Sequence, residues 1–572
     1  MIKYFKQVPF WISLLAVLAI IYDYGFEQEP SVQRILAGFY MLTVLTGLIS
    51  VTGRYIFTKN RPALHVWLFD TFLVIFLGAV IAGFAGPEYM SFFVLPPLLY
   101  SGVFLVFLRE FSALKSTRKL QYLNPAQLFA TSYFAIIILG TILLKLPNAT
   151  YAGISFTDAL FTSTSAFCIT GLIVVDTGSY FTLFGQVIIM LLIQLGGIGI
   201  MTFTSFLAYY FTGSSTYGGQ LLLKDMTNSE KITEVFSIIR LIILFTLIIE
   251  AVGALFIYFS LDKQIITSVE DRIYFSVFHS ISGFCNAGFS TLSASLYDTA
   301  FRFNYSLHLV IAFLFVVGGL GFPIVFNFFR YLKHFLVNRI MKKKALHVPW
   351  VINMNTRIVV ITSVLLLAGG TFLFYIFEYE NTLAGHKGFG KVITAFFGAA
   401  TPRTAGFNTV DTSALMLPTL MLIMLFMWIG AAPGSTGGGI KVTTFAVALM
   451  NVVSNARGKD RIEVFGREVS PASVRRAFAV ILLSMVMTGM SALLITIIEE
   501  DRELLPVLFE CISAYGTVGL SMGITGDLHD TSKLIIIINM FTGRIGMLII
   551  LMSLLRDVKH LNYRYPEEDI LI

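Results

Sequence analysis

Charged residues are scarce in this chain. Only 13% of its 572 residues are Asp, Glu, Lys or Arg, whereas 56% are hydrophobic. A soluble globular domain carries about a quarter charged residues, so this composition excludes that class of protein. Cysteine is scarce too: the three cysteines are odd in number and match no disulfide or metal-binding spacing. The chain shows no nucleophile–base pair, metal-ligand cluster, phosphorylation domain or nucleotide-binding domain, so we expect no enzyme, no ATP-driven pump and no organic cofactor.

Long apolar runs are abundant instead. A run of about 20 residues crosses a bilayer as a helix, and clear examples span residues 128–146, 238–259, 358–377 and 478–498. Lysine and arginine gather between the runs, in segments 109–119, 330–357 and 457–476. Because basic loops stay in the cytoplasm, this pattern predicts a multi-pass protein of the cell (inner or cytoplasmic) membrane. The basic loops on the cytoplasmic side of the lipid bilayer account for the net charge of +7, so we expect no nucleic-acid partner.

Four short segments of the chain resemble one another at nearly equal separations. They are Phe-Cys-Ile-Thr-Gly-Leu (167–172), Phe-Cys-Asn-Ala-Gly-Phe (284–289), Pro-Arg-Thr-Ala-Gly-Phe (402–407) and Tyr-Gly-Thr-Val-Gly-Leu (515–520). A phenylalanine lies ten residues before each shared glycine: Phe161, Phe278, Phe396 and Phe509. A small residue lies six before it: Ser165, Ser282, Ala400 and Ser513. The regular spacing predicts a four-fold internal repeat.

Each repeat has the same expected course. A long apolar helix is followed by a short semi-polar helix, the glycine segment and a second apolar helix. The short helix cannot cross a bilayer, so it must enter and leave on the same side. Irregular backbone at membrane depth is tolerated only where protein buries it or where it lines a water-filled path. We therefore predict an all-α integral membrane protein with four parallel helix–pore-loop–helix repeats around a central pore, preceded by about four extra N-terminal transmembrane helices.

The glycine segments suit cation binding. Rings of backbone carbonyls can replace the hydration shell of a monovalent cation. Glycine adopts positive φ readily, so successive carbonyls can point the same way. The segments hold no ring of acidic residues, such as a divalent-selective pore can use. The predicted ion-binding filter comprises Ile169, Thr170, Gly171, Asn286, Ala287, Gly288, Thr404, Ala405, Gly406, Thr517, Val518 and Gly519.

These segments resemble the Trk/Ktr/HKT superfamily of potassium transporters, and most of all the Ktr/Trk membrane subunit. The resemblance covers about residues 120–560 and rests on six motifs, at 158–172, 194–199, 285–290, 401–409, 433–441 and 543–546. It implies potassium uptake, with potassium bound by the filter residues and drawn inward by the membrane potential. It also implies a homodimer and a cytosolic nucleotide-binding ring supplied by another protein.

Two other functions remain open at this stage. The first is a sodium-selective member of the same superfamily. The resemblance implies that sodium-preferring members carry serine at the first-repeat glycine, where this chain has Gly171. The second is an ion-coupled secondary transporter, which often has inverted repeats; the repeats here run parallel. The sequence does not indicate whether transport depends on sodium.

A glycine-rich stretch interrupts the third inner helix between residues 430 and 439. Ile440 and the helical context exclude a phosphate-binding loop. A kink needs one glycine rather than five, so with the family resemblance we interpret the stretch as a loop that obstructs the pore below the filter. Arg544 lies mid-helix, where an arginine costs about 2.5–3.5 kcal/mol, so we expect it to face the pore. The predicted gate comprises Gly434, Gly437, Gly438, Gly439, Lys441 and Arg544.

The expected domains follow from these elements. The pore repeats span residues 120–212, 230–340, 350–455 and 470–560, with a cytoplasmic tail at 561–572. Residues 1–110 precede the part that resembles the family, with helices expected at about 10–24, 35–52, 64–84 and 92–108. Asp70 suggests a voltage sensor, but the fourth helix lacks regularly spaced arginines, so a structural or dimer-packing role is favoured.

Overall fold

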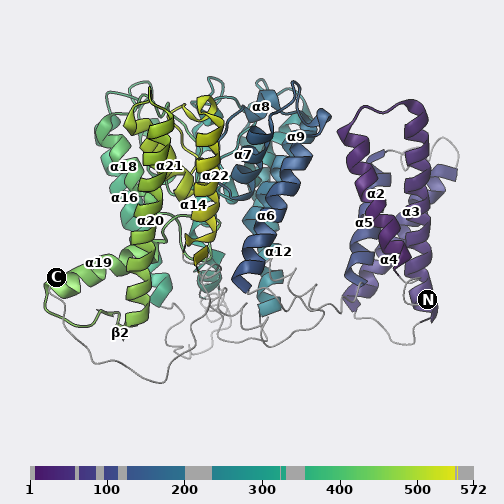
Figure 1. The fold of residues 1–572 in the computed structure, drawn as a ribbon, viewed down its shortest axis with the longest axis horizontal. Coiled ribbons are helices and arrows are strands. Elements are labelled where there is room, and N and C mark those ends of the chain that lie inside the picture. The colour runs from purple at the N-terminus through teal and green to yellow at the C-terminus, as the bar shows by residue number, and fades with distance from the viewer. Residues whose placement is uncertain are drawn as a thin grey trace.

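The chain folds almost entirely into helices (Figure 1). The computed structural model describes residues 7–57, 64–85, 96–113, 125–199, 235–322, 324–329, 331, 354–547 and 550–551. In this part of the chain, the strands form one short hairpin, β1 (Glu463–Val464) with β2 (Arg467–Glu468). The predicted all-α fold is confirmed.

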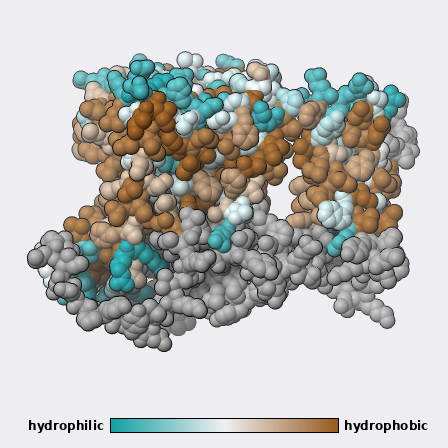
Figure 2. All heavy atoms as spheres, in the orientation of Figure 1, coloured by the Kyte–Doolittle hydropathy of each residue, from teal (hydrophilic) through white to brown (hydrophobic). Residues whose placement is uncertain are grey.

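The described helices have the composition of membrane spans. By length and hydropathy, six of them could cross a bilayer: α2, α3, α4, α12, α16 and α20, whose bounds follow below. Figure 2 shows hydrophobic side chains across the middle height of the molecule and hydrophilic ones along its upper edge. Such a band is what a bilayer requires, because lipid tails cannot solvate polar groups.

The N-terminal helices form a bundle with its own core. They are α2 (Val8–Gly25), α3 (Pro30–Phe57), α4 (Leu64–Ala85) and α5 (Pro96–Ala113). Asp70 of α4 is only 2% exposed and receives a hydrogen bond of 2.8 Å from Arg109 of α5. Arg54 of α3 pairs with the buried Glu110 at 2.5 Å. These ion pairs explain why charged side chains are tolerated inside an apolar bundle.

Four helical units follow, each with an outer helix, a short helix and an inner helix. The first has α6 (Pro125–Leu144), α7 (Phe156–Phe167) and α9 (Leu183–Ile198), with α8 (Thr177–Tyr180) before α9. The second has α12 (Val235–Ser260), α13 (Val269–Phe284) and α14 (Tyr305–Leu320). The third has α16 (Met354–Glu378), α17 (Phe389–Ala400) and α18 (Leu417–Trp428), and then α19 (Val442–Ala456). The fourth has α20 (Pro471–Ile498), α21 (Leu504–Gly516) and α22 (Asp530–Ile545).

Two of the four short helices start at side-chain caps, and all four run with their C-terminal ends toward the glycine segments. Ser155 accepts the Asp158 N–H at 3.0 Å to begin α7, and Ser268 accepts the Asp271 N–H at 3.4 Å to begin α13. α7 and α17 have 12 residues each, α21 has 13 and α13 has 16. At about 1.5 Å per residue, none spans a hydrocarbon core of about 30 Å. Their negative C-terminal dipole ends favour a cation at the centre.

The bundle and the first repeat meet near their upper ends. Asn148 Nδ2 donates to the Tyr24 carbonyl at 3.1 Å, and the Tyr24 ring stacks on Phe184. In Figure 1 the four N-terminal helices stand beside the pore repeats at one end of the molecule. The tail expected at residues 561–572, and parts of the expected repeats such as 200–212 and 332–340, lie outside the described residues.

Candidate ion pore

The four filter segments, residues 169–171, 286–288, 404–406 and 517–519, share one unusual backbone. Each begins with a residue of positive φ: Ile169 (56°), Asn286 (61°), Thr404 (76°) and Thr517 (49°). Each ends with a glycine of positive φ: Gly171 (90°), Gly288 (71°), Gly406 (77°) and Gly519 (92°). Positive φ is uncommon outside glycine, so its recurrence at four equivalent positions is a shared feature of the repeats. In each segment φ is positive at the first and third residues but not at the middle one. This alternation of φ can turn successive carbonyls toward one side, as an ion path requires.

The four segments form a closed ring. A Cβ built on the glycine of each segment would lie closer than 3.0 Å to the middle carbonyl oxygen of the next segment. The pairs are Gly171 with Ala287, Gly288 with Ala405, Gly406 with Val518, and Gly519 with Thr170. The order around the ring is therefore the order along the chain, and the fourth segment lies next to the first. It follows that the first segment faces the third, and the second faces the fourth.

A hydroxyl behind each segment supports it. Ser165 Oγ donates to the Leu172 carbonyl at 2.7 Å and accepts the Gly171 N–H at 3.1 Å. Ser282 donates to the Phe289 carbonyl at 2.7 Å, and Ser513 accepts the Gly519 N–H at 3.1 Å. These bonds satisfy backbone groups that no regular structure pairs.

The third repeat obtains its hydroxyl from a different position. Thr401 Oγ1 donates to the Phe407 carbonyl at 2.6 Å. The predicted equivalence of Ala400 is therefore wrong by one residue. The phenylalanine is displaced in the same way, because Phe397 is fully buried and Phe396 is only partly buried. In the third repeat the supporting hydroxyl and the buried phenylalanine lie five and nine residues before the glycine, whereas in the other repeats they lie six and ten residues before it, so counting back from the glycine misplaces both contacts.

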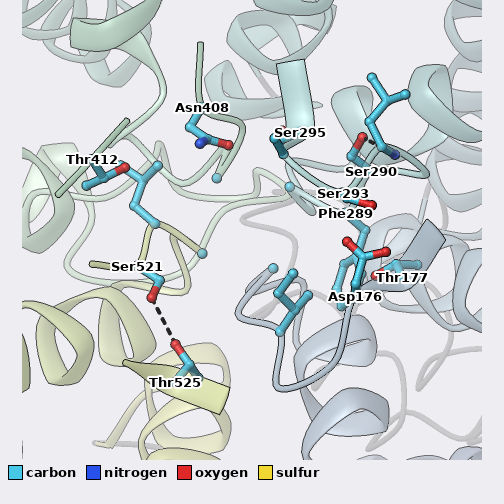
Figure 3. A pocket seen from close by; sticks show the side chains of 18 of the residues that line it. Asp176, Thr177, Phe289, Ser290, Ser293, Ser295, Asn408, Thr412, Ser521 and Thr525 are labelled. Carbon is cyan, nitrogen blue, oxygen red and sulfur yellow. Dashed lines mark hydrogen bonds between the residues drawn. The ribbon is translucent and has the colours of Figure 1, made fainter. Parts of the chain in front are cut away.

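A cavity of about 310 Å³ lies over the filter segments (Figure 3). All four filter glycines line it, together with residues that follow each segment, among them Asp176, Ser290, Asn408 and Ser521. Its position at the glycine end of the segments makes it a vestibule. Hydroxyl, amide and carboxylate oxygens on its wall suit a hydrated cation.

The glycine-rich loop lies at the opposite end of the filter segments. It connects α18 to α19, and Ile429 pairs with Ile440 across its neck. The Gly438 N–H donates to Thr517 Oγ1 at 3.0 Å. Thr436 Oγ1 donates to Asn286 Oδ1 at 3.2 Å. A Cβ on Gly437 would lie closer than 3.0 Å to Thr404 Oγ1, so the loop contacts the first residue of three filter segments.

Arg544 and Lys441 hold this loop. Arg544, on α22, is 8% exposed; its guanidinium donates to the Thr436 carbonyl and, at 3.0 Å, to the Gly196 carbonyl. Lys441 Nζ donates to the Gly437 carbonyl at 2.6 Å. Gly434 and Gly439 have positive φ of 72° and 65°. The predicted gate residues thus belong to one loop and its anchor: Gly434, Gly437, Gly438, Gly439, Lys441 and Arg544.

Sequence reasoning did not assign a role to the glycines at the ends of three inner helices. Gly196, Gly318 and Gly543 each lie so close to the last residues of their own short helix that a Cβ would approach a carbonyl oxygen closer than 3.0 Å. Three residues later each inner helix ends at a glycine of positive φ: Gly199 (102°), Gly321 (85°) and Gly546 (91°). The recurring pattern Gly-x-Ile/Leu-Gly was visible in the sequence and could have identified them.

Comparison with known proteins agrees with this architecture. The family model TrkH, described as a cation transport protein, matches residues 103–560. The chain is 38% identical over 451 residues to the Ktr system potassium uptake protein B of Bacillus subtilis, covering 78% of this chain and 96% of that protein. It is 35% identical over 461 residues to the potassium/sodium uptake protein NtpJ of Enterococcus hirae, covering 79% and 97%.

A solved structure shares the fold. The crystal structure of the potassium transporter TrkH from Vibrio parahaemolyticus superimposes with a TM-score of 0.58 and 18% sequence identity. The match covers 86% of this chain and 97% of that one. At this identity the likeness supports the fold alone, an all-α membrane architecture.

Proposed function

The chain belongs to the TrkH family of cation transport proteins, and on that premise we propose that it takes up potassium across the cell membrane through a filter of backbone carbonyls. The observation that carries the proposal is the closed ring of four segments, each with two residues of positive φ. The Bacillus subtilis relative is named as a potassium uptake protein. A ring of carbonyls replaces the water around potassium at lower cost than the more tightly held water around sodium.

The obstruction beneath the filter is the second part of the proposal. The glycine-rich loop lies across the end of the filter away from the vestibule and contacts three of its four segments. Arg544 adds a positive charge there and ties the loop to α9 through Gly196. A cation leaving the filter must displace the loop, so its release from Arg544 would open the path.

The driving force is the membrane potential. An inside-negative potential is worth about 2.3 kcal/mol per charge per 100 mV, enough to draw a monovalent cation inward without a chemical fuel. Sodium dependence is a separate question, and the name of the Enterococcus hirae relative includes both ions. Glycine at all four filter positions favours potassium over a sodium-selective function.

The assembly is also proposed. We expect a homodimer, each subunit with its own pore, and a cytosolic nucleotide-binding ring that acts on the gate. The exposed hairpin β1–β2 and the segment before it offer such a ring a charged surface, in which Lys459 pairs with Glu463 at 3.5 Å and Arg461 with Glu468 at 3.7 Å. A second basic segment that we propose for docking, residues 330–344, lies mostly outside the described residues.

Flux measurement on the purified protein in liposomes tests the function. Under an imposed inside-negative potential, potassium influx should exceed sodium influx and should continue without a proton gradient. A preference for sodium would favour the sodium-selective function. Strict coupling of each potassium ion to a proton would favour a secondary transporter.

A further inference from the structure

Two buried titratable side chains occupy equivalent positions in opposite repeats. His279 directly follows Phe278 on α13, and Glu510 directly follows Phe509 on α21, where each phenylalanine lies ten residues before the filter glycine. His279 is 0% exposed and Glu510 is 1% exposed. The first repeat has Thr162 at this position, and the third has Gly398 after the buried Phe397. The second and fourth repeats face each other across the ring, so the two groups are related by an approximate two-fold axis.

Each of these groups contacts a serine at the vestibule. His279 Nε2 lies 2.9 Å from Ser290 Oγ. Glu510 accepts a hydrogen bond from Ser521 Oγ. Ser290 and Ser521 are both two residues past the filter glycine and both line the vestibule. Figure 3 shows them on its wall, where Ser521 Oγ also lies 3.0 Å from Thr525 Oγ1. The corresponding residues of the other repeats are Ile173 and Asn408, which receive no such contact from their short helices in the described chain.

The hydrogen-bond directions are set by the partners. His279 Nδ1 lies 2.9 Å from the Phe275 carbonyl, which can only accept, so Nδ1 carries the hydrogen and Nε2 accepts from Ser290. The imidazole stacks on the Phe275 ring with centroids 3.9 Å apart, which fixes its plane. The Glu510 carboxylate likewise accepts from Ser521 and, at 3.1 Å, from Thr525; with both hydroxyl hydrogens used in this way, the 3.0 Å approach of the two hydroxyl oxygens is not itself a hydrogen bond. In both repeats the serine hydrogen is thus drawn away from the vestibule.

The second contact of each serine is also the same. The N–H of the residue two positions later donates to its Oγ: Leu292 to Ser290 at 3.0 Å, and Gly523 to Ser521 at 2.8 Å. A hydroxyl oxygen that gives its hydrogen to one side and accepts from another retains acceptor capacity. Cations are bound by such oxygens, so both serines can offer an electron pair to an ion in the vestibule.

We propose that Ser290 and Ser521 form a pair of oxygen contacts for potassium entering the filter, and that His279 and Glu510 are the positioning residues that orient them. The inference rests on the proposed potassium function. It gives the outer end of the filter two-fold rather than four-fold symmetry, with the polar contacts on the second and fourth repeats.

Transport kinetics in liposomes test the pair and its supports together. Ser290→Ala and Ser521→Ala should each raise the KM for potassium about three- to tenfold, the value of one neutral hydrogen bond or ligand contact, with little change in maximal rate. His279→Phe and Glu510→Leu should have the same effect. Glu510→Gln keeps an acceptor oxygen and should stay within about twofold of the unmodified protein. Thr162→Val is the matched control in the first repeat and should leave KM unchanged.

Double variants separate positioning from packing. His279→Phe combined with Ser290→Ala should be no worse than either change alone, because both remove one unit. In the double variant Ser290→Ala with Ser521→Ala, the two fold increases in KM should multiply, because the two serines act separately. Additive effects within a repeat, or a lower maximal rate with unchanged KM, would overturn the inference.

Potassium-dependent thermal stabilisation of the purified protein gives a second readout. The potassium concentration that gives half-maximal stabilisation should be higher in the same variants than in the unmodified protein. If the unmodified protein shows neither flux nor stabilisation by potassium, the proposed function fails, and the inference with it. If the unmodified protein shows both and the serine variants match it, the inference alone fails.

Discussion

The third repeat agrees with the other three at the filter and departs from them beneath it. Its segment has positive φ at the same two positions as the others, and it contacts its neighbours in the ring in the same way. Below the filter, however, α9, α14 and α22 end at Gly-x-Ile/Leu-Gly, whereas α18 ends at Met427-Trp-Ile-Gly430 and leads into the glycine-rich loop. The four repeats must be alike where they close one ring, but a single repeat is enough to obstruct one path.

The largest expected effect tests what the three similar repeats share. Gly543 packs against the Tyr515 carbonyl without space for a Cβ, whereas a Cβ on Gly546 would meet nothing within 4 Å. Gly543→Ala should therefore lower the unfolding free energy by about 3 kcal/mol or more, since backbone atoms must move. Gly546→Ala should cost less, from its φ of 91° alone. Thermal unfolding of the purified protein in detergent compares the two, and equal losses would contradict the packing argument.

The next effect tests the feature common to all four repeats. A serine at Gly171 would strike the Ala287 carbonyl and oppose the positive φ, so Gly171→Ser should reduce the preference for potassium over sodium by at least about tenfold. The same change at Gly288, Gly406 or Gly519 should also reduce the preference for potassium, because each of these glycines faces the middle carbonyl of the next segment. The potassium-to-sodium flux ratio of each variant is the measurement. A full preference in Gly171→Ser would refute the filter assignment.

The feature confined to the third repeat should control flux rather than ion choice. Arg544→Ala removes the charge-assisted hydrogen bonds from Arg544 to the carbonyls of Thr436 and Gly196. A hydrogen bond of this kind is worth about 1.5–3 kcal/mol. Potassium flux should rise about tenfold or more, with an unchanged potassium-to-sodium ratio. Deleting Gly437 and Gly438 from the loop should act in the same direction. If both variants fold and conduct like the unmodified protein, the loop is not the gate.

Much of this architecture follows from the sequence because the repeat is periodic. The nearly equal spacing of Gly171, Gly288, Gly406 and Gly519 was enough to predict four similar segments, and apolar runs were enough to predict the helices. Contacts between distant segments were not predictable in this way. Neither the Asp70–Arg109 pair nor the bond from Arg544 to Gly196 has any signal in local sequence, because each joins different helices. The cost of an arginine at mid-membrane predicted that Arg544 faces the pore, but it did not identify the carbonyls to which Arg544 donates.

Alignment on the glycines also assumed that every repeat has the same length. The third repeat has one residue fewer between its supporting hydroxyl, on Thr401, and its glycine, so the predicted Phe396 and Ala400 are replaced in space by Phe397 and Thr401. A one-residue shift rotates a helical position by about 100°, which moves a side chain from the buried face to the flank. This shift has no local sign in the sequence, because Phe396 and Phe397 are both apolar and Ala400 and Thr401 are both small.

The smallest expected effect tests this register. Phe397 is fully buried against α14, with its ring 5.3 Å from Phe315, whereas Phe396 is partly exposed. Phe397→Leu should therefore cost about 1–1.5 kcal/mol of unfolding free energy, and Phe396→Leu less than about 0.5 kcal/mol. Thr401→Val, which keeps the shape but removes the bond to the Phe407 carbonyl, should cost about 1 kcal/mol. Registering the repeats strictly on their glycines would reverse the order of the two phenylalanine variants. Thermal unfolding of the three proteins under one detergent condition decides between the registers, because only the shifted one makes Phe397 the equivalent of Phe161, Phe278 and Phe509.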